Sequence, residues 1–171
     1  MGGTVSATAI RLPLDPVPDT ELGRLYRFWR DRLVDGVPPT VRSIRPEELR
    51  FMLGRINLVD VLEGPQFRYR LVGTKIAAVG GFDMQGQIVS ALKPPVFARL
   101  VESHFAEGFV QQAPNLHELT VSRGTIVRRY QRLVLPYTPE PGSGFIGALM
   151  TGTWYDEDIL EVLGHPDFMA G

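Results

Sequence analysis

Apolar and charged side chains alternate along residues 66–71, directly after the turn-forming run Glu63-Gly64-Pro65. The apolar positions are Phe67, Tyr69 and Leu71, and Arg68 and Arg70 lie between them. A period of two places the two sets on opposite faces of a β-sheet, which predicts a half-buried strand. Residues 56–62 before the turn are apolar except for Asn57 and Asp60, so they are predicted to form a more deeply buried strand of the same hairpin.

Upstream of the hairpin, apolar residues recur every three or four positions, which is the period of a helix. They are Leu22, Leu25, Tyr26, Trp29 and Leu33. We expect a helix that Asp19 or Thr20 caps and that ends near Gly36. Its apolar stripe has to be buried, either on the domain itself or on a second copy of the helix. A second, short helix is predicted at 46–53, because Pro46 and two acidic residues suit a helix N-terminus.

Downstream of the hairpin, the pattern predicts a brief helix, a glycine-containing loop and a long helix with one apolar side, at residues 75–79, 80–87 and 95–112. Short turns then separate three further predicted strands, at residues 116–123, 126–136 and 145–154. Such short connections imply antiparallel pairing. A last short helix is expected at 156–163. Residues 1–18 are mostly small or polar and include three prolines, so we expect a flexible arm there.

The composition excludes several classes of chemistry. The 171 residues carry 18 Lys+Arg against 19 Asp+Glu, a formal net charge of -1, so nothing in the overall charge favours nucleic acid or a membrane surface. The absence of cysteine excludes disulfides, thiolate metal sites and cysteine nucleophiles. The sequence has no signal-peptide pattern and no apolar run of about 18 residues, so we expect a cytoplasmic protein of one domain.

The order of the predicted elements, two strands, a helical middle and three antiparallel strands, resembles the PAS fold. More specifically, the chain is similar to a family of short single-domain bacterial PAS-like proteins. The segments that carry this resemblance are residues 25–29 (LYRFW), 42–46 (RSIRP), 67–74 (FRYRLVGT), 133–136 (LVLP) and the loop that contains Gly81 and Gly86. The resemblance implies an α+β fold with a five-stranded antiparallel sheet (β-β-α-α-β-β-β), in which helices over one face enclose a pocket.

The resemblance also implies a division of the chain and a mode of assembly. The expected parts are a flexible arm (1–18), an N-terminal helical cap (19–54), the PAS-like domain (55–155) and a C-terminal short helix and tail (156–171). PAS domains commonly dimerise through a helix that flanks the sheet. In this chain that interface would consist of Leu22, Leu25, Tyr26, Trp29 and Leu33.

Two cofactors common among PAS domains make specific demands on the sequence. A covalent flavin adduct needs a cysteine, and the chain has none. Haem needs an axial ligand, and the candidate is His104 on the apolar side of the long helix. The alternative for His104 is a core histidine whose ring nitrogens are hydrogen-bonded. His117 and His165 are not spaced with His104 or with a carboxylate as a metal site requires, so no metal site is predicted.

The candidates for ligand binding are residues predicted to face inward from the strands and the long helix: Tyr69, Leu71, Phe97, Leu100, His104, Tyr130, Leu149 and Thr151. Either they surround a small molecule or they simply fill the core. The sheet also carries Arg68, Arg70, Arg128, Arg129 and Arg132. These arginines either form a solvated face paired with acids, or one of them points inward and favours an anionic ligand such as a carboxylate.

Three functions remain open at this point. The leading interpretation is a sensory or regulatory module that binds a small molecule and signals through a dimer or a protein partner. The second is a dimerisation or adaptor protein whose core is filled and holds no ligand. The third is a small enzyme that uses Asp60 and Tyr130 as acid and base. The sequence has no phosphate-binding glycine loop, no His-Glu-x-x-His and no Gly-x-Ser-x-Gly, so we do not expect an enzyme.

Overall fold

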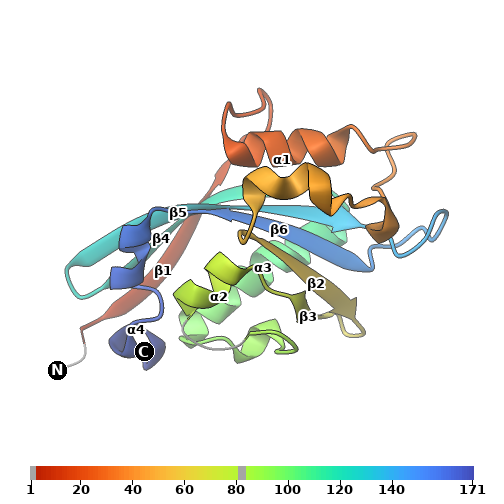
Figure 1. The fold of residues 1–171 in the computed structure, drawn as a ribbon. Helices are drawn as coiled ribbons and strands as arrows, with labels where there is room; N and C mark the ends of the chain where they lie inside the picture. The colour runs from red at the N-terminus through yellow and green to blue at the C-terminus, as the bar shows by residue number, and fades with distance from the viewer. Residues whose placement is uncertain (1–2, 81–83) are drawn as a thin grey trace.

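A six-stranded antiparallel sheet forms the centre of the computed structural model, which describes residues 3–80 and 84–171 (Figure 1). The strands are β1 (Val5–Leu12), β2 (Ile56–Leu62), β3 (Gln66–Leu71), β4 (Asn115–Arg123), β5 (Ile126–Tyr137) and β6 (Ala148–Trp154). They lie in the order β1-β4-β5-β6-β2-β3, and every neighbouring pair is antiparallel. The predicted α+β fold with an antiparallel PAS-like sheet is therefore confirmed, with one strand more than expected.

The helical segments are close to their predicted positions. They are the α-helices α1 (Glu21–Arg30), α2 (Thr74–Gly80), α3 (Pro95–Gln111) and α4 (Pro166–Met169), and the 3-10 helices η1 (Val41–Ser43), η2 (Pro46–Met52), η3 (Val89–Ala91) and η4 (Glu157–Glu161). The second predicted helix is thus the 3-10 helix η2, and α1 ends at Arg30, before the expected stop at Gly36. The loop predicted at 80–87 lies partly outside the described residues.

The additional strand comes from the segment that was expected to be a flexible arm. β1 pairs with β4 along its whole length, from Val5 opposite Arg123 to Leu12 opposite Leu116. Ala7 faces the core, where it is 8% exposed, while Thr8 is exposed. The expectation of a mobile arm was wrong because small side chains are enough for a strand whose backbone is paired with a neighbour and covers the neighbour's edge.

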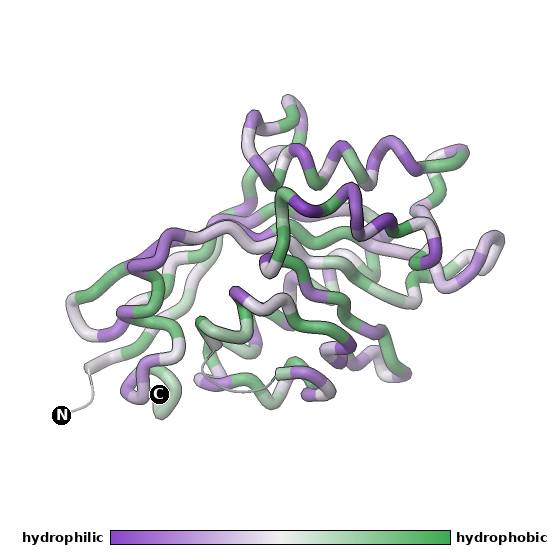
Figure 2. The backbone as a smooth tube through the Cα atoms, in the orientation of Figure 1, coloured by the Kyte–Doolittle hydropathy of each residue, from purple (hydrophilic) through white to green (hydrophobic). Residues whose placement is uncertain are grey.

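Helices cover both faces of the sheet rather than the single face that was expected. Helix α1 and η2 lie on one side, and α2 and α3 lie on the other (Figure 1). Hydrophobic positions gather in the strands and on the helix sides that meet them, whereas the outer turns of α1 are hydrophilic (Figure 2). The sheet therefore separates two layers of apolar packing.

Helix α1 uses its apolar stripe to pack on the chain's own sheet. Thr20 caps the helix by accepting a hydrogen bond from the Gly23 amide at 3.1 Å. Leu22, Leu25 and Trp29 are 1%, 0% and 4% exposed and pack with residues of β4, β5 and β6. The Trp29 indole also donates a hydrogen bond to the Pro136 carbonyl at 2.7 Å.

This packing corrects the expected dimer interface. Leu22, Leu25 and Trp29 are covered within one chain, so they are not available to a second copy. The other two members of the stripe, Tyr26 and Leu33, are partly buried against the same cluster. Of the two ways of burying the stripe that the sequence left open, the structure uses the domain itself.

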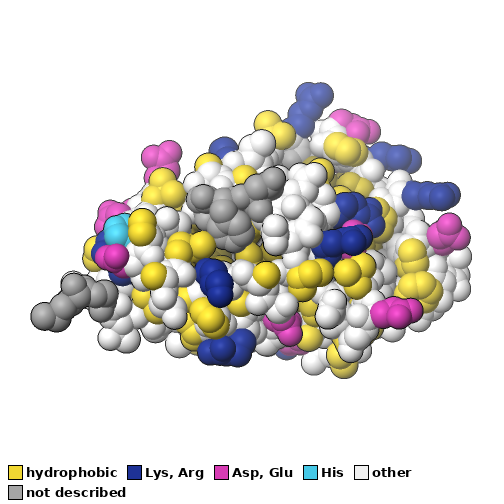
Figure 3. All heavy atoms as spheres, turned by 90° about the horizontal axis from the view of Figure 1, so that it is seen from below, with side chains coloured by type: hydrophobic (Ala, Val, Ile, Leu, Met, Phe, Trp, Pro, Cys, Tyr) yellow, Lys and Arg dark blue, Asp and Glu magenta, His cyan; other side chains and the backbone are white. Residues whose placement is uncertain are grey.

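The opposite face of the sheet carries the second layer. Ala98, Val101 and Phe105 of α3 are buried against β2, β3 and β5, and α4 adds the fully buried Phe168 near the C-terminus. Seen from this side, charged side chains of both signs are scattered among apolar ones and form no large patch of a single sign (Figure 3). This second layer contains the cavity described next.

Candidate ligand-binding site

A small cavity of about 80 Å³ lies between the inner face of the sheet and the layer formed by α2, α3 and the C-terminal tail. Four of the eight predicted ligand-binding residues line it: Tyr69, Phe97, Tyr130 and Thr151. Its wall also includes residues that the sequence did not single out as ligand contacts, among them Asn57, Val101, Phe105, Arg132, Thr153, Tyr155 and Phe168. The wall is therefore mostly apolar and aromatic with a few polar groups, as in small-molecule sites.

The other four predicted ligand residues lie elsewhere. Leu71 is 48% exposed, because the pairing of β2 with β3 shifts register between Leu58 and Val59 and changes the direction of the strand's end. Leu149 is fully buried in the core, and Leu100 packs against the neighbouring apolar cluster. His104 is buried beside the cavity but does not line it.

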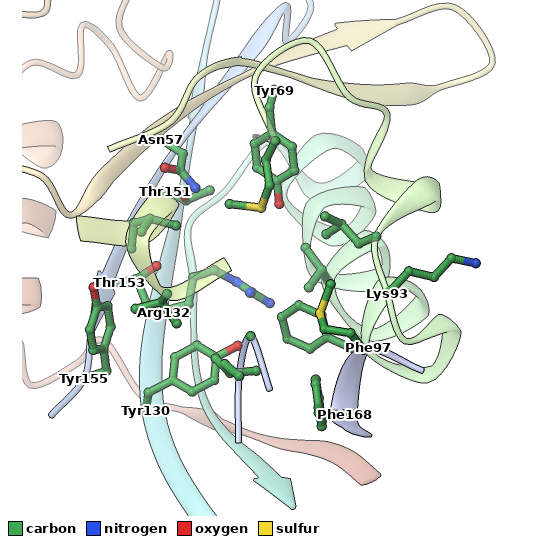
Figure 4. Close-up of a pocket in the computed structure, with 18 of the residues that line it drawn as sticks. Asn57, Tyr69, Lys93, Phe97, Tyr130, Arg132, Thr151, Thr153, Tyr155 and Phe168 are labelled. Carbon is green, nitrogen blue, oxygen red and sulfur yellow. The ribbon is translucent and has the colours of Figure 1, made fainter. Parts of the chain in front are cut away.

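Arg132 is the one strand arginine of the predicted group that is buried. Its side chain is 6% exposed and extends from β5 towards the middle of the cavity (Figure 4). In the sheet it lies opposite His117 of β4 and Thr153 of β6, so the three side chains share one face. The sequence offered a signal for this position, because Arg132 is two residues after the inward-facing Tyr130.

The other arginines follow the solvated interpretation. Arg68 and Arg70 contact Asp60, at 3.4 Å and 2.7 Å. Arg128 pairs with Asp158 at 3.2 Å and with Glu161, both in η4, and Arg129 is exposed. Asp60 lies with Arg68 and Arg70 on the sheet face opposite the cavity, away from Tyr130. The acid–base pair that the enzyme hypothesis required is therefore not assembled.

Arg132 lacks a counter-charge among the residues that the structure describes, since none of their carboxylates forms an ion pair with it. Its Nη2 donates a hydrogen bond to Nδ1 of His104 at 3.0 Å, and its guanidinium carbon lies 5.7 Å from the centre of the Phe105 ring. Its Nε is buried and has no hydrogen-bond partner. A buried ionised group without a counter-charge is costly, which makes this arginine unusual.

Two neutral histidines lie next to Arg132: His104 is hydrogen-bonded to it, and His117 stacks on His104. The rings of His104 and His117 are stacked, with centroids 3.6 Å apart and an angle of 9° between the planes. Burial, together with the nearby Arg132 charge, lowers the pKa of His104 to about 3 and that of His117 to about 4. Because arginine can only donate, Nδ1 of His104 accepts from it and the ring proton lies on Nε2. His117 Nδ1 donates in turn to Asn115 Oδ1, at 3.1 Å.

This arrangement does not fit haem. His104 is held by Arg132 and by the stack on His117, and it does not present a ring nitrogen to the cavity. It matches the alternative interpretation, a core histidine with hydrogen-bonded ring nitrogen. A cavity of about 80 Å³ is also far below the roughly 300–1,000 Å³ typical of sites for drug-sized ligands, so the site as it stands accommodates neither haem nor a flavin ring. Among the described residues there is no group of three or more potential metal ligands.

Most of the remaining polar groups of the cavity wall are hydroxyls, beside the Asn57 amide, which accepts a hydrogen bond from the Gly73 backbone N–H, and the exposed Lys93. Tyr69 and Tyr130 direct their hydroxyl groups towards the cavity (Figure 4). Burial raises the pKa of both, although the Arg132 charge opposes this effect, so both stay protonated at neutral pH. The hydroxyl oxygen of Thr151 is buried and has no hydrogen-bond partner. The cavity wall thus combines the buried charge of Arg132 with neutral hydroxyl groups, and the exposed Lys93 is a second cation among the lining residues.

Comparison with known protein families shows which family the chain belongs to. A model described as "PAS domain" matches residues 19–150, which is most of the chain. The chain belongs to the PAS domain family. The resemblance found in the sequence is thereby confirmed, and membership supports a sensory or regulatory role in general. Strand β1 and the tail that contributes Phe168 to the cavity lie outside the matched part of this PAS protein.

Comparison with individual proteins adds little further. No curated protein gives a significant match. A similar solved structure is described as an RNA-binding light-oxygen-voltage receptor; it is 12% identical with a TM-score of 0.46, and the match covers 94% of this chain and 40% of that one. This PAS chain thus spans about two fifths of that receptor. None of the described helices of this PAS chain is both long enough and apolar enough to cross a bilayer.

Proposed function

We propose that this PAS-domain chain is a sensory module that binds a small molecule in the cavity between the sheet and α3 and transmits the change through contacts with a partner protein or a second copy. The observation that carries the proposal is that two residues of the cavity wall, Arg132 and Thr151, each have a buried polar atom without a hydrogen-bond partner, the Nε and the hydroxyl oxygen respectively. Buried polar atoms are nearly always hydrogen-bonded, so two exceptions in one cavity favour a missing occupant.

The same observation weighs against the two other functions. An adaptor protein that holds no ligand needs no cavity with two such residues in its wall. An enzyme that uses Asp60 and Tyr130 as acid and base would need both groups at one site. Asp60 instead pairs with Arg68 and Arg70 on the sheet face opposite the cavity. We therefore expect binding without catalysis.

Native mass spectrometry of protein purified without added ligand tests the proposal, together with thermal unfolding in the presence of a library of small metabolites. A co-purified mass or a raised melting temperature is expected, because a ligand that binds only the folded state stabilises it. A protein that carries no extra mass and that no compound stabilises would overturn the proposal.

The variant Thr151→Val localises the effect to the cavity. Valine has the shape of threonine without the hydroxyl group, so the ligand-free protein should keep its fold and gain about 1–3 kcal/mol from removal of an unsatisfied buried group. The stabilisation by ligand should shrink. Thr153→Val is the matched control, since Thr153 lines the same cavity from the same strand but its hydroxyl is not among the unsatisfied atoms. Equal effects of the two substitutions would contradict the assignment.

A further inference from the structure

The charge and size of the cavity define its ligand more closely than the fold does. We propose that the ligand is a small monocarboxylate, an organic acid with one carboxylate group and a short apolar body, and that Arg132 binds the carboxylate. This inference rests on the proposed function, since it names the ligand class of the same cavity.

The charge of Arg132 is not balanced within the described chain. Its guanidinium is buried, points into the cavity, and is not paired with any carboxylate among residues 3–80 and 84–171. The groups around it, His104, His117, Tyr69 and Tyr130, are neutral at neutral pH and provide no negative charge. An anion bound in the cavity would supply the counter-charge that the chain itself does not provide.

The N–H donors of Arg132 have the geometry that a carboxylate requires. A carboxylate accepts two parallel N–H bonds from one guanidinium, and the unpaired Nε–H of Arg132 with an adjacent η N–H forms such a pair. The hydrogen bond from Nη2 to His104 fixes the plane of the guanidinium in advance. The Thr151 hydroxyl, on the neighbouring strand β6, is a further unpaired donor for the same anion.

The cavity's charge and volume limit the charge and size of its ligand. Arg132 balances one buried negative charge, and Lys93, the other cation among the described lining residues, is exposed, so a dicarboxylate or a phosphate would leave excess negative charge in an apolar surrounding. A cavity of about 80 Å³ is several times the roughly 10–15 Å³ that one water molecule needs and far below the roughly 300–1,000 Å³ of sites for drug-sized ligands, which suits a short-chain acid. Phe97, Val101, Phe105 and Phe168 provide apolar contacts for its body.

The test uses the full chain and isosteric pairs of probes. Thermal unfolding and titration calorimetry are performed with propionate, butyrate and pentanoate, with the corresponding neutral amides, and with succinate and inorganic phosphate. We expect the monocarboxylates to raise the melting temperature and to bind at least about 10-fold more tightly than their amides, because an amide has no negative charge and offers the guanidinium only one acceptor oxygen instead of two. Succinate and phosphate should bind more weakly than the best monocarboxylate.

Two variants assign the effect to Arg132. Arg132→Gln should abolish the preference for acid over amide, and Arg132→Lys, which keeps the charge but loses the paired N–H groups, should weaken carboxylate binding at least about 10-fold. Arg129→Gln, at an exposed position of the same strand, is the control and should bind as the wild type does. If the Arg132 variants do not fold, the comparison of acids with amides on the wild-type protein decides the question.

The possible failures are distinguishable. Amides that bind as tightly as acids, or a stronger response to succinate or phosphate, would overturn the monocarboxylate while leaving a ligand-binding cavity in place. Unchanged acid binding by a folded Arg132→Gln would overturn the role of Arg132. The absence of any bound mass and of any stabilising compound would instead overturn the proposed function itself.

Discussion

At the scale of single residues, the stacked pair His104 and His117 makes stability depend on pH. In the folded protein the pKa values are lowered to about 3 and about 4, whereas in the unfolded chain both are near 6.5. Below pH 6.5 the unfolded chain therefore binds protons that the folded protein excludes. The free energy of unfolding should be constant with respect to these groups above pH 6.5 and should fall as the pH drops towards 4.

The size of this effect follows from about 1.4 kcal/mol per pKa unit, so acidification from pH 6.5 to 4.5 should lower the free energy of unfolding by roughly 2 to 5 kcal/mol. Denaturant unfolding at a series of pH values measures it. The double variant His104→Gln/His117→Gln should show a flatter dependence than the wild-type protein. A slope that survives in the double variant would show that other groups cause it.

The residue scale also shows what the sequence was able to predict about the site. Tyr69, Tyr130 and Thr151 were placed correctly because alternation along a strand determines which side chains point inward. Leu71 was misplaced because a register shift is a property of two paired strands and leaves no pattern in either one. The sequence did not decide whether Arg132 is solvated or points inward, because no pattern within one strand shows whether the facing helix carries an acidic partner.

At the scale of elements, β1 offers the sharpest test of the structure, because the sequence pattern indicated a flexible arm. Ala7→Asp should cost at least about 2 kcal/mol of unfolding free energy, because it places a carboxylate in the apolar cluster that contains Leu119 and Phe168. Thr8→Asp, at the exposed neighbouring position, should change the free energy by no more than about 0.5 kcal/mol. Equal and small effects at both positions would mean that residues 5–12 are not a paired strand.

The elements that were predicted well share a physical property. The hairpin of β2 and β3, helix α1 and strands β4 and β5 have strong apolar periodicity, which reflects burial on one side or on both. β1 has little apolar content and gains its order from pairing with β4, a contact with residues more than 100 positions away in the sequence. A local sequence pattern cannot predict pairing with a strand so far away in the chain.

At the scale of the whole molecule, the sheet separates two apolar layers that should contribute to stability independently. Leu25 of α1 packs against one face of the sheet, and Ile146 belongs to the cluster between α3 and the other face. Leu25→Ala should cost about 2–5 kcal/mol and Ile146→Val about 0.5–1.5 kcal/mol. Because the two sites share no cluster, the cost of the double variant should equal the sum within about 0.5 kcal/mol.

A pair on one face provides the contrast. A Cβ atom built on Gly152 would lie 2.5 Å from Cδ2 of Leu25 and 3.2 Å from Cε of Met52, so these side chains meet over the same point of β6. Leu25→Ala combined with Met52→Leu should therefore depart from additivity by about 0.5 kcal/mol or more, as measured by denaturant unfolding of the four proteins in each cycle. Coupling of Leu25 to Ile146 as strong as its coupling to Met52 would contradict the separation. Additivity across the sheet would instead mean that α1 can be altered, to probe contacts with a partner, without disturbing the cavity around Arg132.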